Sequence, residues 1–397
     1  MKRFVVLALV CLACKASAPP EQYGFVAMLG NDTVSVEHVS RSATKLVSDE
    51  VDQWPLVKVR HTEFDLAHDG KVTHMVMDVR TPSGETPAQR GRRVIAEFTR
   101  DSVMISITDS AGVTRRSFRT GGALTVPHVS MMYSAIELEI ASALRNGGGP
   151  IAAGDSASFR QFYPDRDVGP GFVLHSGWVH RHSVDSVVLN HDWLSGSGDV
   201  TVDSVGRMLT YSGKRSTYQV DVKRVTVIPY VAASAERLAA AEKKAGAAQL
   251  SVRDTTRASI GTATLSIDYG RPLARGRTLL GNVIKYNHIW RTGANAATQF
   301  TTSAPITLAG LTLPAATYTL WTVPHTSGVD LIVNTESGQW GTEYSSAKDL
   351  GTAPLHTETV PTPVEKFAIS IAGTDAKHGT LVMDWGTFRW TAPIVVK

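Results

Sequence analysis

The 397-residue chain contains only two cysteines, Cys11 and Cys14, and both lie near its N-terminus. The rest of the chain therefore has no disulfide, no thiol nucleophile and no cysteine ligand for a metal. The chain also lacks a large excess of either sign of charge, because 40 lysines and arginines against 36 aspartates and glutamates leave a net charge of +4. No basic tract is long enough to indicate a nucleic-acid partner. With 43% hydrophobic residues, the composition instead predicts two or three folded domains.

The first residues have the pattern of a secretory signal. A basic start is followed by apolar residues 4–13, a run too short to span a bilayer. A small residue precedes Cys14, as bacterial lipoprotein processing requires, whereas ordinary cleavage after Ala18 is disfavoured by Pro19. We therefore expect an exported protein, in the periplasm or at the outer membrane, with residues 1–18 as signal and tether and a lipid anchor on Cys14.

Residues 23–231 alternate short β-type runs with turn signals, at spacings typical of all-β domains. The strands that we expect include Thr33–Val39, Val57–Leu66, Val72–Val79, Arg93–Arg100, Ser102–Thr108, Trp178–His182, Ser186–Asn190, Asp199–Val202 and Ser216–Lys223. Short polar turns favour an antiparallel sheet. One helix is expected at residues 129–145, because large apolar residues recur every four positions from Met132 to Leu144, with Glu137 off this stripe.

A curved antiparallel sheet with this helix across its concave face resembles the half-barrel of bacterial lipoprotein carriers. In such a domain the space between helix and sheet either accepts an acyl chain or is filled by side chains. The sequence leaves both alternatives open.

The remaining residues divide into a connector and a second domain. Residues 232–250 are rich in alanine, glutamate and lysine, with Leu238 as the only large apolar residue before Leu250, which predicts a solvated helix acting as a semi-rigid spacer. Residues 251–397 contain many short alternating strands and no long helix, which predicts a β-sandwich. The expected strands include Thr264–Tyr269, Thr298–Thr302, Ile306–Leu308, Thr317–Val323, Val329–Asn334, Phe367–Ile371, Leu381–Trp385, Phe388–Trp390 and Pro393–Val396.

Several short motifs in residues 251–397 occur in the order found in one family. They are Asp268-Tyr269-Gly270-Arg271-Pro272, Arg275-Gly276-Arg277, Trp290-Arg291-Thr292-Gly293-Ala294-Asn295, Leu313-Pro314-Ala315 followed by Tyr318, Leu320 and Trp321, and Gln339-Trp340-Gly341. With these motifs the segment resembles domain-of-unknown-function family 2911. The resemblance implies a bacterial, usually exported, β-rich module without an established biochemical role. Ala296 departs from the acidic residue usual in the family, which puts acid chemistry at that loop in doubt, and Ala316 departs from a usual glycine.

The same motifs gather cationic and aromatic side chains that could bind an anion. The set is Arg271, Arg275, Arg277, His288, Trp290, Arg291, Asn295 and Trp321. Guanidinium groups bind carboxylate, phosphate or sulfate, and a tryptophan face stacks on a sugar or a guanidinium. These residues predict a site for an anionic small molecule or an acidic glycan. The alternative is that the arginines tie loops together through carbonyl oxygens and carboxylates.

Histidines offer a second hypothesis, although no cofactor is otherwise expected. His180 and His182 are two residues apart on an expected strand, so both side chains share one face. His191 and Asp192 could return beside them across a hairpin and complete a zinc shell. The alternative is that these are ordinary exposed histidines.

These patterns together predict a mainly β envelope protein with a non-catalytic role, in binding or handling a lipid or an anionic small molecule or glycan. One alternative is an envelope hydrolase, with a metal at His180 and His182. Another is a structural or interaction protein without a small ligand. We expect membrane contact only through the lipid anchor, and no nucleic-acid partner.

Overall fold

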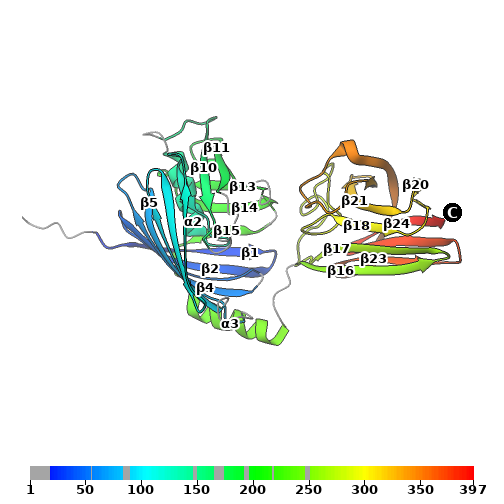
Figure 1. The fold of residues 1–397 in the computed structure, drawn as a ribbon, viewed down its shortest axis with the longest axis horizontal. Helices are drawn as coiled ribbons and strands as arrows, with labels where there is room; N and C mark the ends of the chain where they lie inside the picture. Colours follow the sequence, from blue (N-terminus) through cyan, green and yellow to red (C-terminus); the bar gives the residue numbers. More distant parts are fainter. Residues whose placement is uncertain are drawn as a thin grey trace, which may run out of the picture.

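The computed structural model describes residues 18–54, 56–83, 90–145, 150–164, 174–191, 196–216, 219–245 and 251–397. The chain is mainly β, and its described strands form one sheet of fifteen strands and one of nine, which follow each other along the chain (Figure 1). Residues 1–17, which include most of the expected signal and Cys14, lie outside the described residues. In the described part of the chain, neither helix is long and apolar enough to cross a membrane.

The first sheet is an open array with β8 and β9 as its edge strands. All neighbouring strands pair antiparallel, except that β9 and β10 are parallel. In spatial order the strands are β8 (Gly112–Arg119), β7 (Ser102–Asp109), β6 (Gly91–Phe98), β5 (Val72–Arg80), β4 (Val57–Leu66), β3 (Lys45–Gln53), β2 (Asp32–Arg41), β1 (Glu21–Leu29), β15 (Asp221–Val225), β14 (Met208–Ser216), β13 (Gly196–Val202), β12 (Ser186–Asn190), β11 (His175–Arg181), β10 (Ser156–Phe162) and β9 (Thr125–Pro127).

One expected strand of this sheet, Ser216–Lys223, is wrong. Ser216 is the last residue of β14, and β15 begins only at Asp221. Between them the chain reverses, with Gly213 N donating to Val220 O at 2.7 Å and Gln219 at a φ of 51°. The sequence pattern joined two antiparallel strands across this turn because the turn has no Gly-Pro or Asn-Gly signal.

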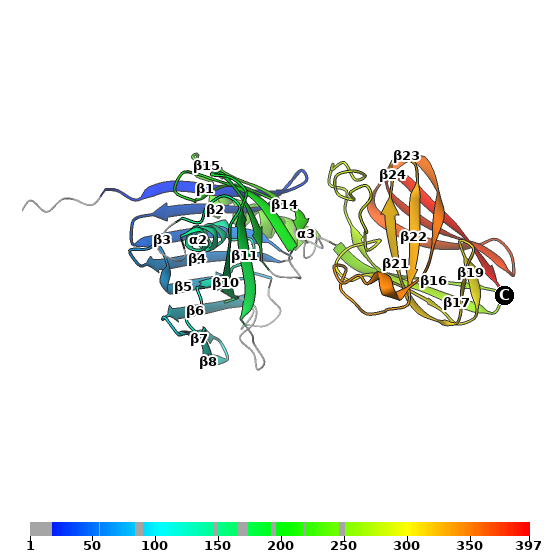
Figure 2. The same cartoon turned by 90° about the horizontal axis from the view of Figure 1, so that it is seen from above.

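The helix α2 (Tyr133–Leu144) lies against the concave side of the first sheet, which bends around it (Figure 2). Every residue of α2 except Ala141 is buried, including Glu137, which lies off the apolar stripe. The N-terminus of the helix meets a carboxylate of β2, because the backbone N–H groups of Tyr133 and Ser134 donate to Glu37 Oε2 at 2.8 and 3.1 Å. This contact places a carboxyl group at the positive end of the helix dipole.

A continuous hydrophobic core fills the space between α2 and the sheet. It includes Phe25 and Phe64 from the sheet and Leu138 and Ile140 from the helix, each fully buried. In the described residues, side chains therefore occupy the region that the sequence left open for an acyl chain.

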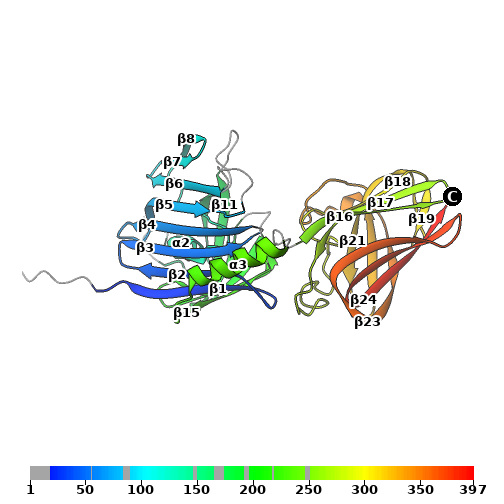
Figure 3. The same cartoon turned by 90° about the horizontal axis from the view of Figure 1, so that it is seen from below.

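The helix α3 (Val231–Ala245) packs on the opposite, convex face of the same sheet, across β2, β3 and β4 (Figure 3). Leu238 is 4% exposed and contacts a cluster formed with Val36, Val51 and Val57. The backbone N–H of Val57 also donates to Glu242 Oε2 at 2.6 Å. Most of α3 is exposed or half-buried, as expected of a solvated helix, but the expectation of a spacer is wrong for this helix, because Val36, Val51 and Val57 of the sheet bury its single leucine.

The second sheet folds over to give the two packed layers of a β-sandwich, with β16 and β17 against β23. Its order is β16 (Ser251–Ile260), β17 (Ala263–Pro272), β18 (Thr298–Thr302), β21 (Ala316–Pro324), β22 (Val329–Asn334), β23 (Asp349–Gly373), β24 (His378–Val396), β19 (Ile306–Leu308) and β20 (Leu311–Leu313), and a short 3₁₀ helix, η1 (Ser346–Lys348), precedes β23. The three segments expected after residue 380 are parts of the single strand β24. Trp385, Trp390 and Phe367 are fully buried between the layers.

Candidate functional site

Four polar side chains meet in the interior of the first sheet, beside α2. His128 directly follows β9, Glu139 lies on α2, Gln161 is on β10 and His191 directly follows β12. Gln161 points inward because it shares a face of β10 with the buried Phe159. The four residues are at most 1% exposed, so each side chain depends on the others for its polar partners.

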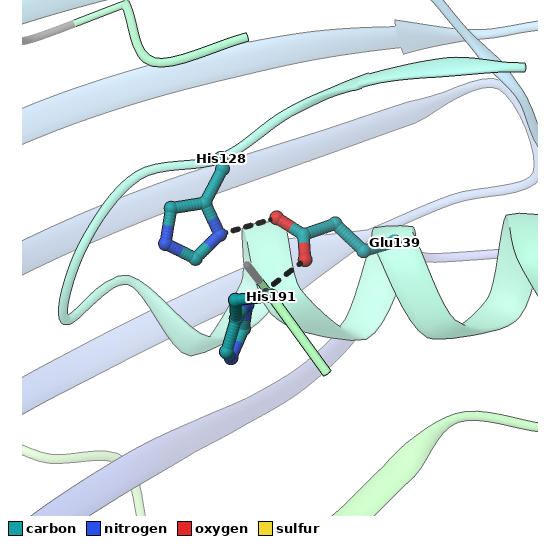
Figure 4. Close-up of side chains that lie close together, drawn as sticks. All are labelled: His128, Glu139 and His191. Atoms are coloured by element: carbon teal, nitrogen blue, oxygen red, sulfur yellow. Dashed lines mark hydrogen bonds and ion pairs between the residues drawn. The ribbon is translucent and has the colours of Figure 1, made fainter. Parts of the chain in front are cut away.

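The ligand atoms of His128, Glu139 and His191 are close enough to share one metal ion (Figure 4). His128 Nδ1 lies 2.7 Å from Glu139 Oε1, and His191 Nδ1 lies 3.7 Å from Glu139 Oε2. One atom from each of His128, Glu139 and His191 lies within 4.8 Å of the others. Gln161 Nε2 lies 3.2 Å from Glu139 Oε2, 3.4 Å from His191 Nδ1 and 3.5 Å from His128 Nδ1.

The carboxylate of Glu139 has no arginine or lysine partner among the described residues; its ion-pair partners are the two histidines. Glu137, two residues earlier on α2, is different. Tyr23 Oη and Arg41 Nη1 each donate to Glu137 Oε1 at 2.6 Å. The charge of Glu137 is therefore balanced by a guanidinium, while that of Glu139 is left to the histidines or to a cation between them.

Two atoms of the cluster are buried without a hydrogen-bond partner, namely Gln161 Oε1 and His128 Nε2. Burial, together with the nearby His128, holds the pKa of His191 well below its usual value, so its imidazole is neutral at neutral pH. A cavity of about 10 Å³, lined in part by His128, His191 and Tyr211, adjoins the cluster. This volume is at the lower limit for a single water molecule.

Of the histidines proposed from the sequence as metal ligands, His180 and His182 do share one face, with ring centroids 4.7 Å apart. His191 does not join them. His180 pairs with Val188, so the two share a face of the sheet. His191 lies one residue beyond β12 and on the opposite, buried face, which it shares with Leu189. Asp192 lies outside the described residues, and within them His180 and His182 belong to no group of three metal-ligating residues.

His128, Glu139 and Gln161 were missed in the sequence. They are separated from one another and from His191 by 11 to 63 positions. Only the side-by-side order of β9, β10, β11 and β12 in the sheet brings them together. The one local signal was a carboxylate on a helix with apolar neighbours on every side.

The arginines predicted to bind an anion lie in the second domain, and three of the four already have partners. Arg271 Nη1 donates to Asp254 at 2.7 Å, and Arg275 pairs with Asp32 at the start of β2. Arg277 donates to two backbone carbonyl oxygens of its own turn, at 2.7 and 3.1 Å. These contacts are those expected of arginines that tie loops together.

The other residues of that predicted site are not gathered around one point. Trp290 stacks on Trp385 at the sandwich core, with ring centroids 5.8 Å apart. Trp321 is 1% exposed in a separate cluster on the other side of β21. His288 is exposed and contacts the carbonyl of Tyr286, while Asn295 is exposed in a loop with a φ of 63°.

Residues 251–394 match the model of the family DUF2911, described as a protein of unknown function. This part of the chain is a DUF2911 domain. The match begins at the start of β16 and ends within β24, so it contains the second sheet except for the last two residues of β24. The expectation from the motifs between residues 268 and 341 is therefore confirmed.

Solved structures give weaker likenesses. A DUF1089 family protein from Pseudomonas aeruginosa is 15% identical, with 52% of this chain and 97% of that chain covered at a TM-score of 0.33. Domains LG4-5 of the mouse laminin α1 chain are 10% identical, with 96% and 76% covered at a TM-score of 0.14. At these TM-scores neither likeness carries an argument. No curated protein matches the chain.

Proposed function

We propose that this protein is an exported bacterial envelope protein that binds a ligand without catalysing a reaction, and that the ligand is a divalent transition-metal ion. The observation that carries the metal is the convergence of His128, Glu139 and His191, at most 1% exposed, with ligand atoms within 4.8 Å of one another. Two imidazoles and a carboxylate are a ligand set suited to zinc. Export rests on the basic and apolar pattern of the first eighteen residues, with a lipid anchor on Cys14.

Gln161 completes the coordination in this proposal. In a tetrahedral zinc site with bonds of about 2.1 Å, neighbouring ligand atoms lie about 3.4 Å apart. The amide end of Gln161 already lies 3.2 to 3.5 Å from atoms of the other three residues. The amide oxygen and nitrogen exchange places by a half-turn, which brings the unpartnered Oε1 toward the ion.

Ion binding requires only small movements of the other side chains. His128 Nδ1 and Glu139 Oε1 are 2.7 Å apart, a hydrogen-bonding distance, and have to separate by roughly 0.7 Å to share a zinc ion. The proton between them is released as the ion binds. The ion in turn neutralises the one carboxylate of α2 that lacks an arginine.

Four protein ligands leave no position for a substrate, and such closed sites are structural rather than catalytic. The adjoining cavity of about 10 Å³ also admits no more than one water molecule. The first domain, in this proposal, is a half-barrel whose centre is occupied by α2 and a metal rather than by an acyl chain. Its filled hydrophobic core supports this choice.

The test is metal binding by the full mature chain, refolded from urea with zinc or cobalt(II), because buried ligands load most readily during folding. We expect one bound ion per chain and, with cobalt, the intense visible absorption of a tetrahedral site. Glu139→Gln should weaken binding on the order of 100-fold or more, because it removes the only charged ligand. Gln161→Leu should retain an ion but change the cobalt spectrum.

The matched control is the double variant His180→Ala/His182→Ala, which removes two histidines from the outer face of the same sheet. It should bind the ion as the wild type does. Loss of binding in the control but not in Glu139→Gln would place the ion on the outer face. A wild-type chain that refolds without retaining either metal would overturn the proposal and leave the cluster as a hydrogen-bonded part of the core.

A further inference from the structure

Arg291, in the DUF2911 domain, is a desolvated cation without a carboxylate. Its Nε atom is buried and has no hydrogen-bond partner. Its one side-chain hydrogen bond, from Nη1 to the carbonyl oxygen of Gly341, is 3.5 Å long. Among the described residues it forms no ion pair, unlike Arg271 in β17 and Arg275 just after this strand. Burial alone lowers the pKa of Arg291 to about 10, with no neighbouring acid to oppose it.

The loop that covers Arg291 adds a second unsatisfied donor. Trp340 Nε1 is buried without a partner, and the next residue, Gly341, lies so close that a Cβ there would overlap Arg291 Cδ. Backbone bonds fix this arrangement, since Trp340 forms a bridge with Ala296 and Gly341 N donates to the Asn295 carbonyl at 3.0 Å. The loop over Arg291 therefore carries one N–H group without an acceptor, in addition to the unpartnered Nε of Arg291 itself.

We propose that Arg291 binds an oxyanion, the phosphate, sulfate or carboxylate group of a small molecule, between the loops at residues 291–296 and 339–343. An oxyanion offers acceptors only, which is what an unmatched guanidinium and an indole N–H require. Arg291 keeps part of its surface exposed although its Nε is buried, so an ion approaches from the exposed part of the side chain. The site shares no residue with the metal cluster, so the two proposals are tested independently.

The direct test observes the arginine side chains of the wild-type full-length protein. In a sample labelled with ¹⁵N-arginine, the Nε–H resonance of Arg291 is the one that disappears in Arg291→Lys. Inorganic phosphate, added at ionic strength matched with chloride, should shift this resonance saturably and leave those of paired arginines in place. Glucuronate in a parallel titration distinguishes a carboxylate ligand from a phosphate ligand. A shift no larger than that caused by chloride, with both anions, would overturn the proposal.

Variants locate the binding. Arg291→Gln removes the charge, and we expect it to weaken binding of the effective anion by at least about tenfold. Arg253→Gln is the matched control, because Arg253 is an exposed arginine of the same domain, paired with Asp268 at 2.9 Å. The control should bind as the wild type does. Equal binding by wild type and Arg291→Gln would place the anion elsewhere and refute the assignment. If Arg291→Gln does not fold, the wild-type titration decides the matter.

Discussion

The carboxyl group of Glu37 makes a pH-dependent contribution to stability that can be worked out from its surroundings. Glu37 is fully buried between β2 and the N-terminus of α2. Ser48 Oγ and the backbone N–H groups of Tyr133 and Ser134 donate to it, and these bonds favour the charged form. Burial opposes them more strongly and raises the pKa of Glu37 from 4.5 to about 7.

The sign follows from proton counting. Between pH 4.5 and 7 the folded protein holds a proton on Glu37 that the unfolded chain has released, so stability falls as the pH rises through this window. The difference of 7 − 4.5 = 2.5 pKa units corresponds to about 3 kcal/mol, complete below pH 4.5 and lost above pH 7. Glu37→Gln keeps the hydrogen-bond acceptor and removes the charge. We therefore expect the variant to be within about 1 kcal/mol of the wild type near pH 5 and to be about 3 kcal/mol more stable at pH 8.

The assay is urea unfolding at both pH values, followed by hydrogen–deuterium exchange of peptides that cover α2. Exchange is preferable to tryptophan fluorescence because five of the eight tryptophans lie in the DUF2911 domain. Glu63→Gln is the control, since Glu63 is an exposed carboxylate on β4 and its loss should change stability by no more than about 0.5 kcal/mol. Glu50 and Glu137 also have raised pKa values; the effect of Glu137 cancels in the comparison with wild type, whereas the charge of Glu37 contributes to the raised pKa of Glu50 and its removal lowers that pKa.

The reasoning is refuted by a difference between Glu37→Gln and wild type that is the same at pH 5 and pH 8. A variant less stable than wild type at pH 8 would also refute it. That result would show that the N-terminus of α2 stabilises the ionised carboxylate by more than burial costs.

Three further changes test other contacts, each by urea or thermal unfolding. Arg60→Met should destabilise the first domain by about 3–5 kcal/mol, because Arg60 is buried between Glu50 and Asp52 and its removal breaks both ion pairs. Leu238→Ala should cost about 2–3 kcal/mol and release α3 to rapid exchange, whereas a solvated helix would be unaffected. Gly341→Ala should destabilise the DUF2911 domain by about 1–3 kcal/mol, because the added Cβ overlaps an arginine side chain and a backbone carbonyl. If any of these variants is as stable as the wild type, the contact on which its prediction rests does not stabilise the fold as described.

Local sequence pattern was sufficient for much of the DUF2911 domain. The strands expected at Thr298–Thr302, Ile306–Leu308 and Val329–Asn334 have those bounds in the structure. Each is short. Burial alternates along Thr298–Thr302 and Ile306–Leu308, whereas Val329–Asn334 is buried at every position except Asp330. The motifs that identify the family are equally local. By contrast, β16 carries no buried residue before Ile260 and was not recognised as a strand.

The sequence by itself determined the mainly β composition, the presence of a helix near residue 136 and the family of the last 147 residues. Only the tertiary structure decided which polar residues meet. His191 could be named from the sequence, but the register of β11 with β12 turns it away from His180 and toward His128 and Glu139. Likewise α3 looked solvated until the outer face of the sheet supplied its partners. Periodicity is set by neighbours along the chain, whereas a metal centre or a docked helix is set by the pairing of segments tens of residues apart.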